Sequence, residues 1–349
     1  MPLENNDPTP TNDLTVSSMA TVPHHQRSNT SRLRRLRNLA GMAMAQYDIP
    51  NAHLSYLQEG DNLLYRVTAP AQGQFLLRVH SPARYNESEI RSELLWLAAL
   101  RCESRLPVPE PMFTRDGSPV CEVSIAGIPD ARCCVLLRWI PGRRKRASLG
   151  TADVKLMGAY IARLHQHAEQ WTPPADFIRA RWDWEHLFGP QSPIWTAGTK
   201  VYQEDELQCF AAAAHRIKAD LRDLGDGSDT FGVIHSDLNP SNFVFREGAA
   251  YAIDFEECVW GYYLYDITVT LSELKKNGDR YEQLREALLD GYQQVRPLAD
   301  SYERYRETFE VMRAVELVHW ILDWESPTFR AWGLSHLAYA VTTLKKFLD

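Results

Sequence analysis

A stretch in the C-terminal half places two carboxylates and an amide at a spacing that few structural explanations fit. Asp237 follows a short apolar run, Asn242 comes five residues later, and Asp254 ends the next β-prone segment. The segment between Asn242 and Asp254 is typical of a hairpin, which would bring these two side chains together. Oxygen ligands of this kind suit Mg²⁺ bound to substrate phosphates. The pattern therefore predicts phosphoryl transfer with Asp237 as the base and Asn242 and Asp254 as metal ligands, and the alternative is a turn stabilised by Asp and Asn.

The residues around this stretch complete a longer pattern. His235 and Asp237 begin the phrase H-x-D-x-x-x-x-N, Phe255 completes a D-F pair, and Asp266 lies between Tyr265 and Ile267 at the head of the next helix. This pattern resembles the aminoglycoside phosphotransferase and choline kinase superfamily, the small-molecule relatives of protein kinases. The resemblance implies ATP and Mg²⁺ as cofactors and a small-molecule hydroxyl acceptor. It also implies structural roles for His235 and Asp266 in supporting the catalytic loop.

The resemblance runs from about Leu54 to the last helices and implies a two-lobed, protein-kinase-like α+β fold. Its small N-terminal lobe would hold an antiparallel sheet and a helix, and its larger C-terminal lobe would be mainly helical. A length of 349 residues exceeds what one hydrophobic core usually fills, which also favours two lobes. We expect a disordered tail over 1–30, a nucleotide-binding lobe over 31–138, and a catalytic and acceptor-binding lobe over 139–349.

The N-terminal half supplies candidates for binding the ATP phosphates. Gly60 and Asn62 lie in a turn between two β-prone runs, although no G-x-G-x-x-G is present. Arg78, in the next alternating strand, takes the position of the kinase lysine, and its guanidinium could bind two phosphate oxygens. The alternative is an exposed arginine on an edge strand. Its partner on the following helix is expected to be Glu93, with Glu89, one turn earlier, as the second choice.

A strand that ends at a Pro-Gly turn is expected to connect the two lobes. Leu137 would line the back of an adenine pocket, and the backbone around Arg138 and Ile140 would hydrogen-bond to adenine. The same residues also fit an ordinary strand that stops before the turn at 141–142.

Two groups of aromatic and acidic residues are candidates for the acceptor site. The first contains Asp183 and Trp184, and the second contains Asp323 and Trp324. Carboxylates beside aromatic faces suit a cationic acceptor through ion pairing and cation–π contact. Each group taken singly also fits tryptophans that pack helices while the acids face water. Together they favour an amine-bearing alcohol, such as an aminoglycoside, choline or a homoserine-like compound.

Two other functions share these residues. One is a protein Ser/Thr kinase of the bacterial stress-response type, although no A-P-E phrase lies between Asp254 and Asp266. The other is a nucleotide-binding pseudokinase. Two departures from the kinase pattern allow it: Arg78 at the position of the kinase lysine and Glu256 at the position of the D-F-G glycine. The complete set of base and metal ligands favours an enzyme over a pseudokinase.

Composition limits the partners and the compartment. A net charge of −7 argues against general nucleic-acid binding, and no apolar run approaches the roughly 20 residues of a membrane span. The six cysteines show no C-x-x-C spacing and indicate reduced thiols. The basic run at 32–37 is expected to belong to an amphipathic helix, in preference to a nucleic-acid or membrane patch, and the one at 143–146 to a solvated loop. We therefore expect a cytoplasmic protein with no nucleic-acid or membrane partner.

Overall fold

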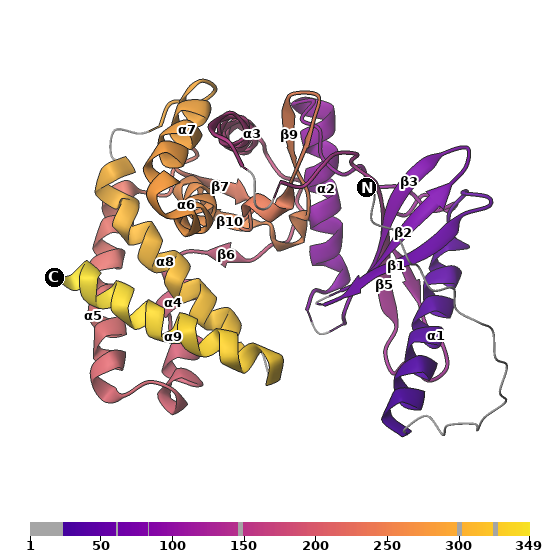
Figure 1. Cartoon of the computed structure of the whole chain (residues 1–349), viewed down its shortest axis with the longest axis horizontal. Coiled ribbons are helices and arrows are strands. Elements are labelled where there is room, and N and C mark those ends of the chain that lie inside the picture. The colour runs from indigo at the N-terminus through magenta and orange to yellow at the C-terminus, as the bar shows by residue number, and fades with distance from the viewer. Residues whose placement is uncertain (1–23, 61, 83, 146–148, 299–301, 324–326) are drawn as a thin grey trace, which may run out of the picture.

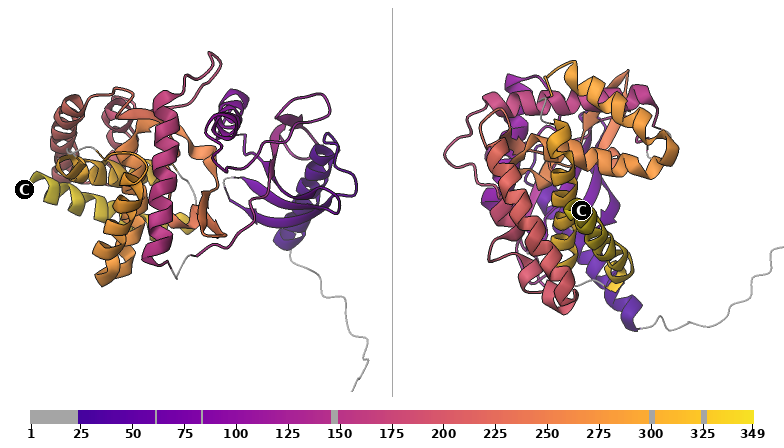
Figure 2. Two further views of the ribbon diagram at one scale, coloured as in Figure 1. Left: turned by 90° about the horizontal axis from the view of Figure 1, so that it is seen from above. Right: turned by 90° about the vertical axis from the view of Figure 1, so that its left-hand side faces the viewer.

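The computed structural model describes residues 24–60, 62–82, 84–145, 149–298, 302–323 and 327–349, with the backbone alone described for 24–30 and 327–332. The chain forms a smaller lobe built on an antiparallel sheet and a larger lobe that is mainly helical (Figure 1). The view from above separates the same two parts (Figure 2). The predicted α+β class with two lobes is confirmed.

The N-terminal lobe is built on a sheet whose strands follow the order β1-β2-β3-β5-β4, all antiparallel. The strands are β1 (His53–Glu59), β2 (Leu63–Ala69), β3 (Gly73–Val79), β4 (Cys121–Val123) and β5 (Arg132–Arg138). Alternate residues of β2 are buried, as in a pleated strand with one face in a core: Leu63, Tyr65 and Val67. Because β3 pairs with β2 on one side and β5 on the other, Arg78 lies on an interior strand and not on an edge.

Helix α1 (His24–Met44) covers one face of this sheet. It packs Leu36, Leu39 and Ala43 into the core of the lobe, and the arginines at 34, 35 and 37 are exposed. The basic run therefore belongs to an amphipathic helix, as expected. The helix begins at His24, inside the range for which a disordered tail was expected, and residues 1–23 lie outside the described part of the chain.

Helix α2 (Glu87–Glu103) lies between the two lobes (Figure 1). It begins with a capping box, in which Asn86 accepts from the Glu89 N–H and Glu89 accepts from the Asn86 N–H, each at 3.0 Å. Its buried face, with Leu94 and Leu97, joins a core that continues into the helices of the C-terminal lobe. Glu89 thus serves as a helix cap, which commits its carboxylate to the backbone.

The C-terminal lobe combines helices with two small sheets. Its helices are α3 (Thr151–Gln170), α4 (Trp184–Phe188), α5 (Glu204–Leu224), α6 (Tyr263–Leu274), α7 (Tyr281–Gln293), α8 (Tyr302–Asp323) and α9 (Pro327–Leu348). Its 3₁₀ turns are η1 (Pro193–Trp195), η2 (Gly198–Lys200), η3 (Pro240–Asn242), η4 (Phe255–Glu257) and η5 (Lys275–Arg280). One sheet has the order β6 (Arg181–Trp182), β10 (Val259–Tyr262), β7 (Phe231–Ile234), and the other is the predicted hairpin, β8 (Phe243–Arg246) with β9 (Ala249–Ala252).

Two glycines allow α3 and α7 to pack closely. A Cβ built on Gly158 would lie 2.0 Å from the carbonyl oxygen of Leu288, and one built on Gly291 would lie 2.0 Å from that of Lys155. Any larger residue at either position would force the two helices apart. This contact fixes the distance between the two helices.

Among the residues that the structure describes, none of the helices combines the length and hydropathy that a membrane crossing requires.

Candidate active site

The loop between β7 and β8 holds the carboxylate of Asp237 between two amides. Asn242, the last residue of η3, donates its Nδ2 to Asp237 Oδ2 at 2.7 Å and to the Asp237 carbonyl at 3.0 Å. Asn239 donates to the other carboxylate oxygen at 3.0 Å. Burial raises the pKa of Asp237, and the nearby guanidinium of Arg313 opposes part of the rise. The geometry therefore orients one half-buried carboxylate whose proton affinity exceeds that of an ordinary aspartate.

Asp266, at the start of α6, binds the backbone of the loop between β7 and β8. Its fully buried carboxylate accepts hydrogen bonds from the backbone N–H of His235 at 3.0 Å and of Ser236 at 2.6 Å. His165 of α3 donates to the same carboxylate at 3.3 Å. Ser236 has a positive φ of 66°, a conformation that a non-glycine residue keeps only when its surroundings hold it. Asp266 supplies that restraint.

His235 connects the two halves of the motif. Its Nε2–H donates to the carbonyl of Ile253 at 3.1 Å, so Nδ1 is left to accept the N–H of Asp237 at 3.3 Å. The ring is buried and packs on Phe255, with the ring centroids 4.5 Å apart. His235 therefore lies in a position to hold the loop and is turned away from solvent, in line with the role that the resemblance implies.

Asp254 follows β9 and lies beside Asn242. The backbone N–H of Ile253 donates to the Asn242 carbonyl at 2.9 Å, which brings the two candidate metal ligands together. Asp254 adopts the left-handed conformation, with φ 70° and ψ 61°, and 46% of its side chain is exposed. Because Asn242 commits its Nδ2 to Asp237, its Oδ1 is the atom left for a cation. An amide oxygen beside an exposed carboxylate fits a hard divalent ion that completes its shell with phosphates and water.

Arg78 forms the centre of a buried ion-pair cluster. Its Nη1 lies 2.9 and 2.8 Å from the two carboxylate oxygens of Glu93, and both side chains are almost fully buried. Its Nη2 lies 3.4 Å from Asp254 Oδ1, and its Nη1 lies 3.5 Å from Glu256 Oε2. Burial opposes the charge of Arg78, but the three carboxylates outweigh it and raise the pKa of the guanidinium. The expected partner Glu93 is the one that pairs with Arg78.

Glu256 is a residue whose role the sequence did not indicate. It lies in η4, where it accepts a hydrogen bond from Asn62 Nδ2, and burial raises its pKa to about 8 with Arg78 opposing. The sequence showed only that an acid replaces the D-F-G glycine. In the fold, that acid adds a third carboxylate beside Arg78.

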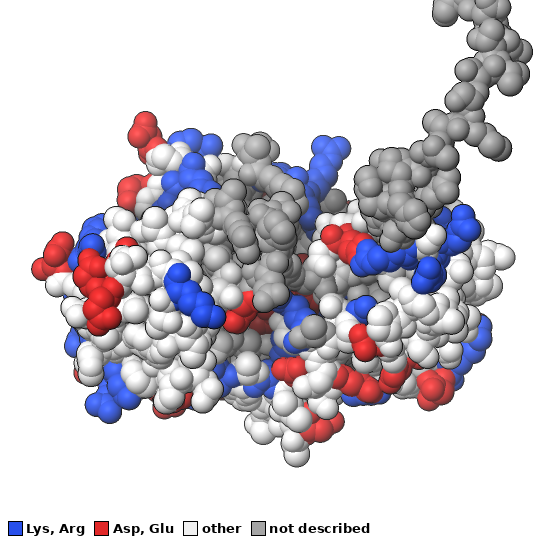
Figure 3. Space-filling view, turned by 90° about the horizontal axis from the view of Figure 1, so that it is seen from below, with Lys and Arg blue, Asp and Glu red and all other residues white. Residues whose placement is uncertain are grey.

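Asn62 and Gly60 close the turn between β1 and β2 over this cluster. Asn62 is buried and accepts the N–H of Ser81 at 3.1 Å, while the N–H of Gly60 donates to the Asn62 carbonyl at 3.0 Å. The hydrogen bond from Asn62 to Glu256 holds this predicted phosphate turn against the loop that carries Asp254. On the face drawn in Figure 3, acidic and basic side chains lie together where the two lobes meet.

Arg179 fixes the backbone around this cluster. Its buried guanidinium donates to the carbonyls of Glu256 and Cys258, and to that of Glu89 on α2 at 3.2 Å. One arginine therefore ties α2 to the loop that follows Asp254. No sequence pattern indicates this contact, because its acceptors are backbone groups.

The candidate adenine residues lie at the end of β5. Leu137 is buried and pairs with Leu76 of β3. The backbone N–H of Arg138 donates to the Glu110 carbonyl at 2.8 Å, and its side chain pairs with the Glu110 carboxylate at 2.7 Å. That N–H is therefore already engaged, which leaves half-exposed Ile140 as the candidate donor of the predicted hinge.

The candidate acceptor residues separate into different environments. Asp183 caps α4 through the N–H groups of Glu185 and His186, and Trp184 donates its indole N–H to the Ala214 carbonyl at 2.8 Å. Both side chains thus make contacts within the scaffold. Asp323 is exposed at the end of α8, and Trp324 lies outside the described residues.

Two residues of α8, Arg313 and Glu316, were not singled out from the sequence. Arg313 of α8 donates to the Tyr265 hydroxyl at 3.2 Å, and its charge acts on Asp237 and on Glu316, one turn further along the same helix. Neither belongs to the motif that contains Asp237, Tyr265 and Asp266. Only the packing of the two helices brings them to the side of Asp237.

Comparisons with known proteins find relatives and solved structures among small-molecule kinases. The amicoumacin kinase of Bacillus subtilis (strain 168) is 23% identical over 236 residues, which are 66% of this chain and 65% of the relative, so the match spans just under two thirds of that protein. The structure of the microcompartment-associated aminopropanol kinase has a TM-score of 0.76 and 30% sequence identity, covering 89% of this chain and 97% of that chain. An amicoumacin kinase solved in complex with AMP-PNP, Ca²⁺ and Ami shares the fold, with a TM-score of 0.75 and 19% identity over 92% of this chain and 96% of that chain.

A family model also matches most of the chain. It is the model of the phosphotransferase enzyme family (APH), and it matches residues 56–307, which include the β1–β2 turn, Arg78, Glu93 and the whole catalytic loop. Two independent likenesses, one to this model and one to a solved kinase at 30% identity, thus cover the site. The chain belongs to the phosphotransferase enzyme family.

Proposed function

We propose that this protein is an ATP- and Mg²⁺-dependent kinase that moves the γ-phosphoryl group to a hydroxyl of a small, amine-bearing alcohol. The observation that carries the proposal is the carboxylate of Asp237, which the amides of Asn239 and Asn242 orient, while Asp254, beside Asn242, pairs with Arg78. Family membership and the similarity to an aminopropanol kinase support it.

Asp237 is the residue that would act on the acceptor. Its carboxylate would accept a hydrogen bond from the acceptor hydroxyl, align that oxygen with the γ-phosphorus, and take the proton as the new P–O bond forms. Because the transition state of phosphoryl transfer is loose, most of the catalytic effect would come from alignment and charge stabilisation. The two amides on Asp237 serve the alignment.

The nucleotide would lie between the lobes. Arg78 would contact the phosphates while Glu93 fixes its guanidinium, and the backbone near Ile140 and the side chain of Leu137 would hold adenine. Asn242 and Asp254 would hold Mg²⁺, which would neutralise phosphate charge. The β1–β2 turn at Gly60 and Asn62 would cover the phosphates.

The amine of the acceptor would be bound near the end of α8. Asp323 is an exposed carboxylate there, and burial and nearby Glu316 raise its pKa, while His186 opposes the rise. A cationic group beside Asp323 would relieve this crowding of negative charge. The alternative acceptor residues Asp183 and Trp184 remain candidates from the sequence, although both are engaged within the scaffold.

The test is ADP release by the purified full-length chain with ATP, Mg²⁺ and a panel of acceptors. The panel should hold aminopropanol, ethanolamine, choline, homoserine, aminoglycosides and a Ser/Thr-rich protein. We expect acceptor-dependent turnover with an amino alcohol, which is lost in Asp237→Asn and on removal of Mg²⁺ by chelation. Turnover with the protein alone would favour a protein kinase. Nucleotide binding without turnover for any acceptor would favour a pseudokinase.

A further inference from the structure

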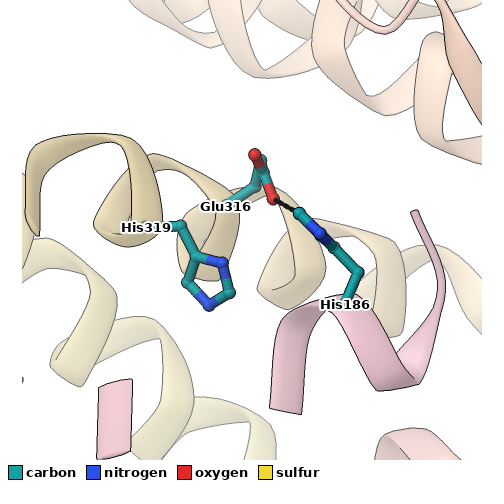
Figure 4. A group of neighbouring side chains, drawn as sticks. All are labelled: His186, Glu316 and His319. Atoms are coloured by element: carbon teal, nitrogen blue, oxygen red, sulfur yellow. Dashed lines mark hydrogen bonds and ion pairs between the residues drawn. The ribbon is translucent and has the colours of Figure 1, made fainter. Parts of the chain in front are cut away.

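Three side chains that the proposed reaction does not use converge between α4 and α8 (Figure 4). They are His186 of α4 and Glu316 and His319 of α8, and one donor atom from each lies within 4.8 Å of the others. Glu316 and His319 are three residues apart on one helix, so they project from the same face. His186 meets them across the gap, with its Nε2 at 2.9 Å from Glu316 Oε2.

The protonation of His319 is fixed by its surroundings. Its Nε2–H donates to the backbone carbonyl of Leu187 at 3.0 Å, and the hydroxyl of Ser192 lies at 3.0 Å from the same nitrogen. The proton therefore resides on Nε2, and Nδ1 carries a free lone pair. In Figure 4, Nδ1 lies on the side of the ring that faces Glu316 and His186. A histidine held by a carbonyl through one nitrogen, with the other directed at a carboxylate and a second imidazole, is the usual arrangement of a metal ligand.

His186 is also held in place. Its ring is stacked on that of Trp182, with the centroids 5.4 Å apart and the planes 12° from parallel. About 30% of its side chain is exposed, so an ion in solution has access to the group. Glu316 is nearly buried, and although burial favours its neutral form, the hydrogen bond and charge of His186 lower its pKa. The group therefore presents one carboxylate and two imidazoles with restricted rotation.

We propose that His186, Glu316 and His319 bind a divalent transition-metal ion of the Zn²⁺ class between α4 and α8. Two imidazole nitrogens and one carboxylate oxygen are ligands that Zn²⁺ favours, and three protein ligands leave a fourth position for water or another donor. Mg²⁺ prefers oxygen ligands, so this site is chemically distinct from the one at Asn242 and Asp254.

The metal would stabilise the position of α8 beside the candidate active site. Arg313 lies one turn before Glu316 on α8, and its charge acts on both Glu316 and Asp237. An ion that joins α4 to α8 would therefore restrain the helix that positions Arg313. Binding itself does not depend on the proposed kinase activity, because the ligands belong to neither the base nor the nucleotide cluster.

The experiment measures Zn²⁺ binding by the full-length protein with Mg²⁺ in excess, using a competing chromophoric chelator and metal analysis. We expect about one equivalent of tightly bound Zn²⁺ and a rise in Tm when it is added. Glu316→Gln keeps the size of the side chain and removes its charge, and His186→Asn removes the imidazole; each should weaken binding by about 10-fold or more. His215→Ala, which removes an exposed histidine on α5, is the matched control and should bind as the wild type does.

Co²⁺ substitution identifies the ligands independently of stability. Nitrogen and oxygen ligands give visible d–d bands without the intense near-ultraviolet thiolate bands that cysteine ligands produce, and these d–d bands should disappear in the double variant His186→Asn/Glu316→Gln. The proposal is overturned if the wild type binds no Zn²⁺, which would leave a plain His–Glu ion pair. It is equally overturned if the double variant binds Zn²⁺ as tightly as the wild type, or if thiolate bands appear.

Discussion

Asn62, in the turn between β1 and β2, donates a hydrogen bond to Glu256, which lies 194 residues further along the chain. The contact joins the N-terminal lobe to the loop that carries Asp254. It also places an acid where D-F-G kinases have glycine, and burial raises the pKa of that acid to about 8. The turn that we propose covers the phosphates is therefore attached to a group that gains or loses a proton near neutral pH.

The first prediction concerns stability and pH. The folded-state pKa of Glu256 is about 8 and its ordinary value is 4.5, so the native state binds the extra proton between these values. The contribution of Glu256 to the free energy of unfolding should be fully present below about pH 4.5. It should then fall by about 1.4 kcal/mol per pH unit as the pH rises from about 4.5 toward about 8. Glu256→Gln should remove this decline. Urea unfolding across the window measures it, and parallel pH profiles for both proteins would contradict the assignment.

The second prediction concerns the buried pair of Arg78 and Glu93. Arg78→Met leaves Glu93 buried without its partner and should cost about 3–5 kcal/mol of unfolding free energy. The double variant Arg78→Met/Glu93→Leu removes both charges and should recover much of that loss without restoring ATP binding. Chemical denaturation together with nucleotide-induced Tm shifts separates the two effects. A single variant as stable as the wild type would show that the pair contributes little.

The third prediction concerns the base. Arg313 opposes the rise that burial causes in the pKa of Asp237. Arg313→Met should therefore raise that pKa further and move the acid limb of the kcat/KM profile to higher pH, because Asp237 must be ionised to accept a proton. Arg306→Met, on the same helix and paired with Glu310, is the control and should leave the limb in place. An unshifted limb in Arg313→Met would remove Arg313 from this role.

The fourth prediction concerns the contact between α3 and α7. Gly158→Ala would place a methyl group 2.0 Å from the Leu288 carbonyl, and we expect a loss of about 1–3 kcal/mol or more. Gly41→Ala, in the helix α1 with no atom within 4 Å of the added Cβ, should be neutral or stabilising by up to about 1 kcal/mol. Thermal unfolding of the two variants gives the comparison. Equal Tm values would mean that the helices move apart at little cost.

The parts of the site that follow one another in the sequence could be predicted from it. Asp237, Asn242 and Asp254 lie within one loop and hairpin, so their spacing already specified their proximity. Arg78 and Glu93 were placed correctly because a strand and the next helix have few ways to pack. Residues joined across long separations could not be found this way. His186 and Glu316 are 130 residues apart, and helical periodicity shows that a side chain faces inward without showing what it meets.

The same limit applies to the two groups of aromatic and acidic residues that were candidates for the acceptor site. We grouped Asp183 with Trp184 because they are adjacent in the sequence. In the fold, Asp183 caps α4 and Trp184 donates its indole N–H to the Ala214 carbonyl, so the two side chains have different partners. Trp182, two residues before Trp184, instead stacks on His186 beside Glu316. Adjacency in the sequence therefore did not show which side chains meet in the fold; the direction in which each one leaves its backbone decides that.

The guanidinium of Arg179 links the two sides of the proposed nucleotide site mechanically. It donates to the carbonyls of Glu89 on α2 and of Glu256 and Cys258, which follow Asp254, and so links these segments through their backbones. A tilt of α2 that moves Glu93 would be transmitted to Asp254 through backbone hydrogen bonds alone. The Arg78–Glu93 pair and the proposed metal ligand Asp254 would then move together, so that a nucleotide bound at one would also position the other.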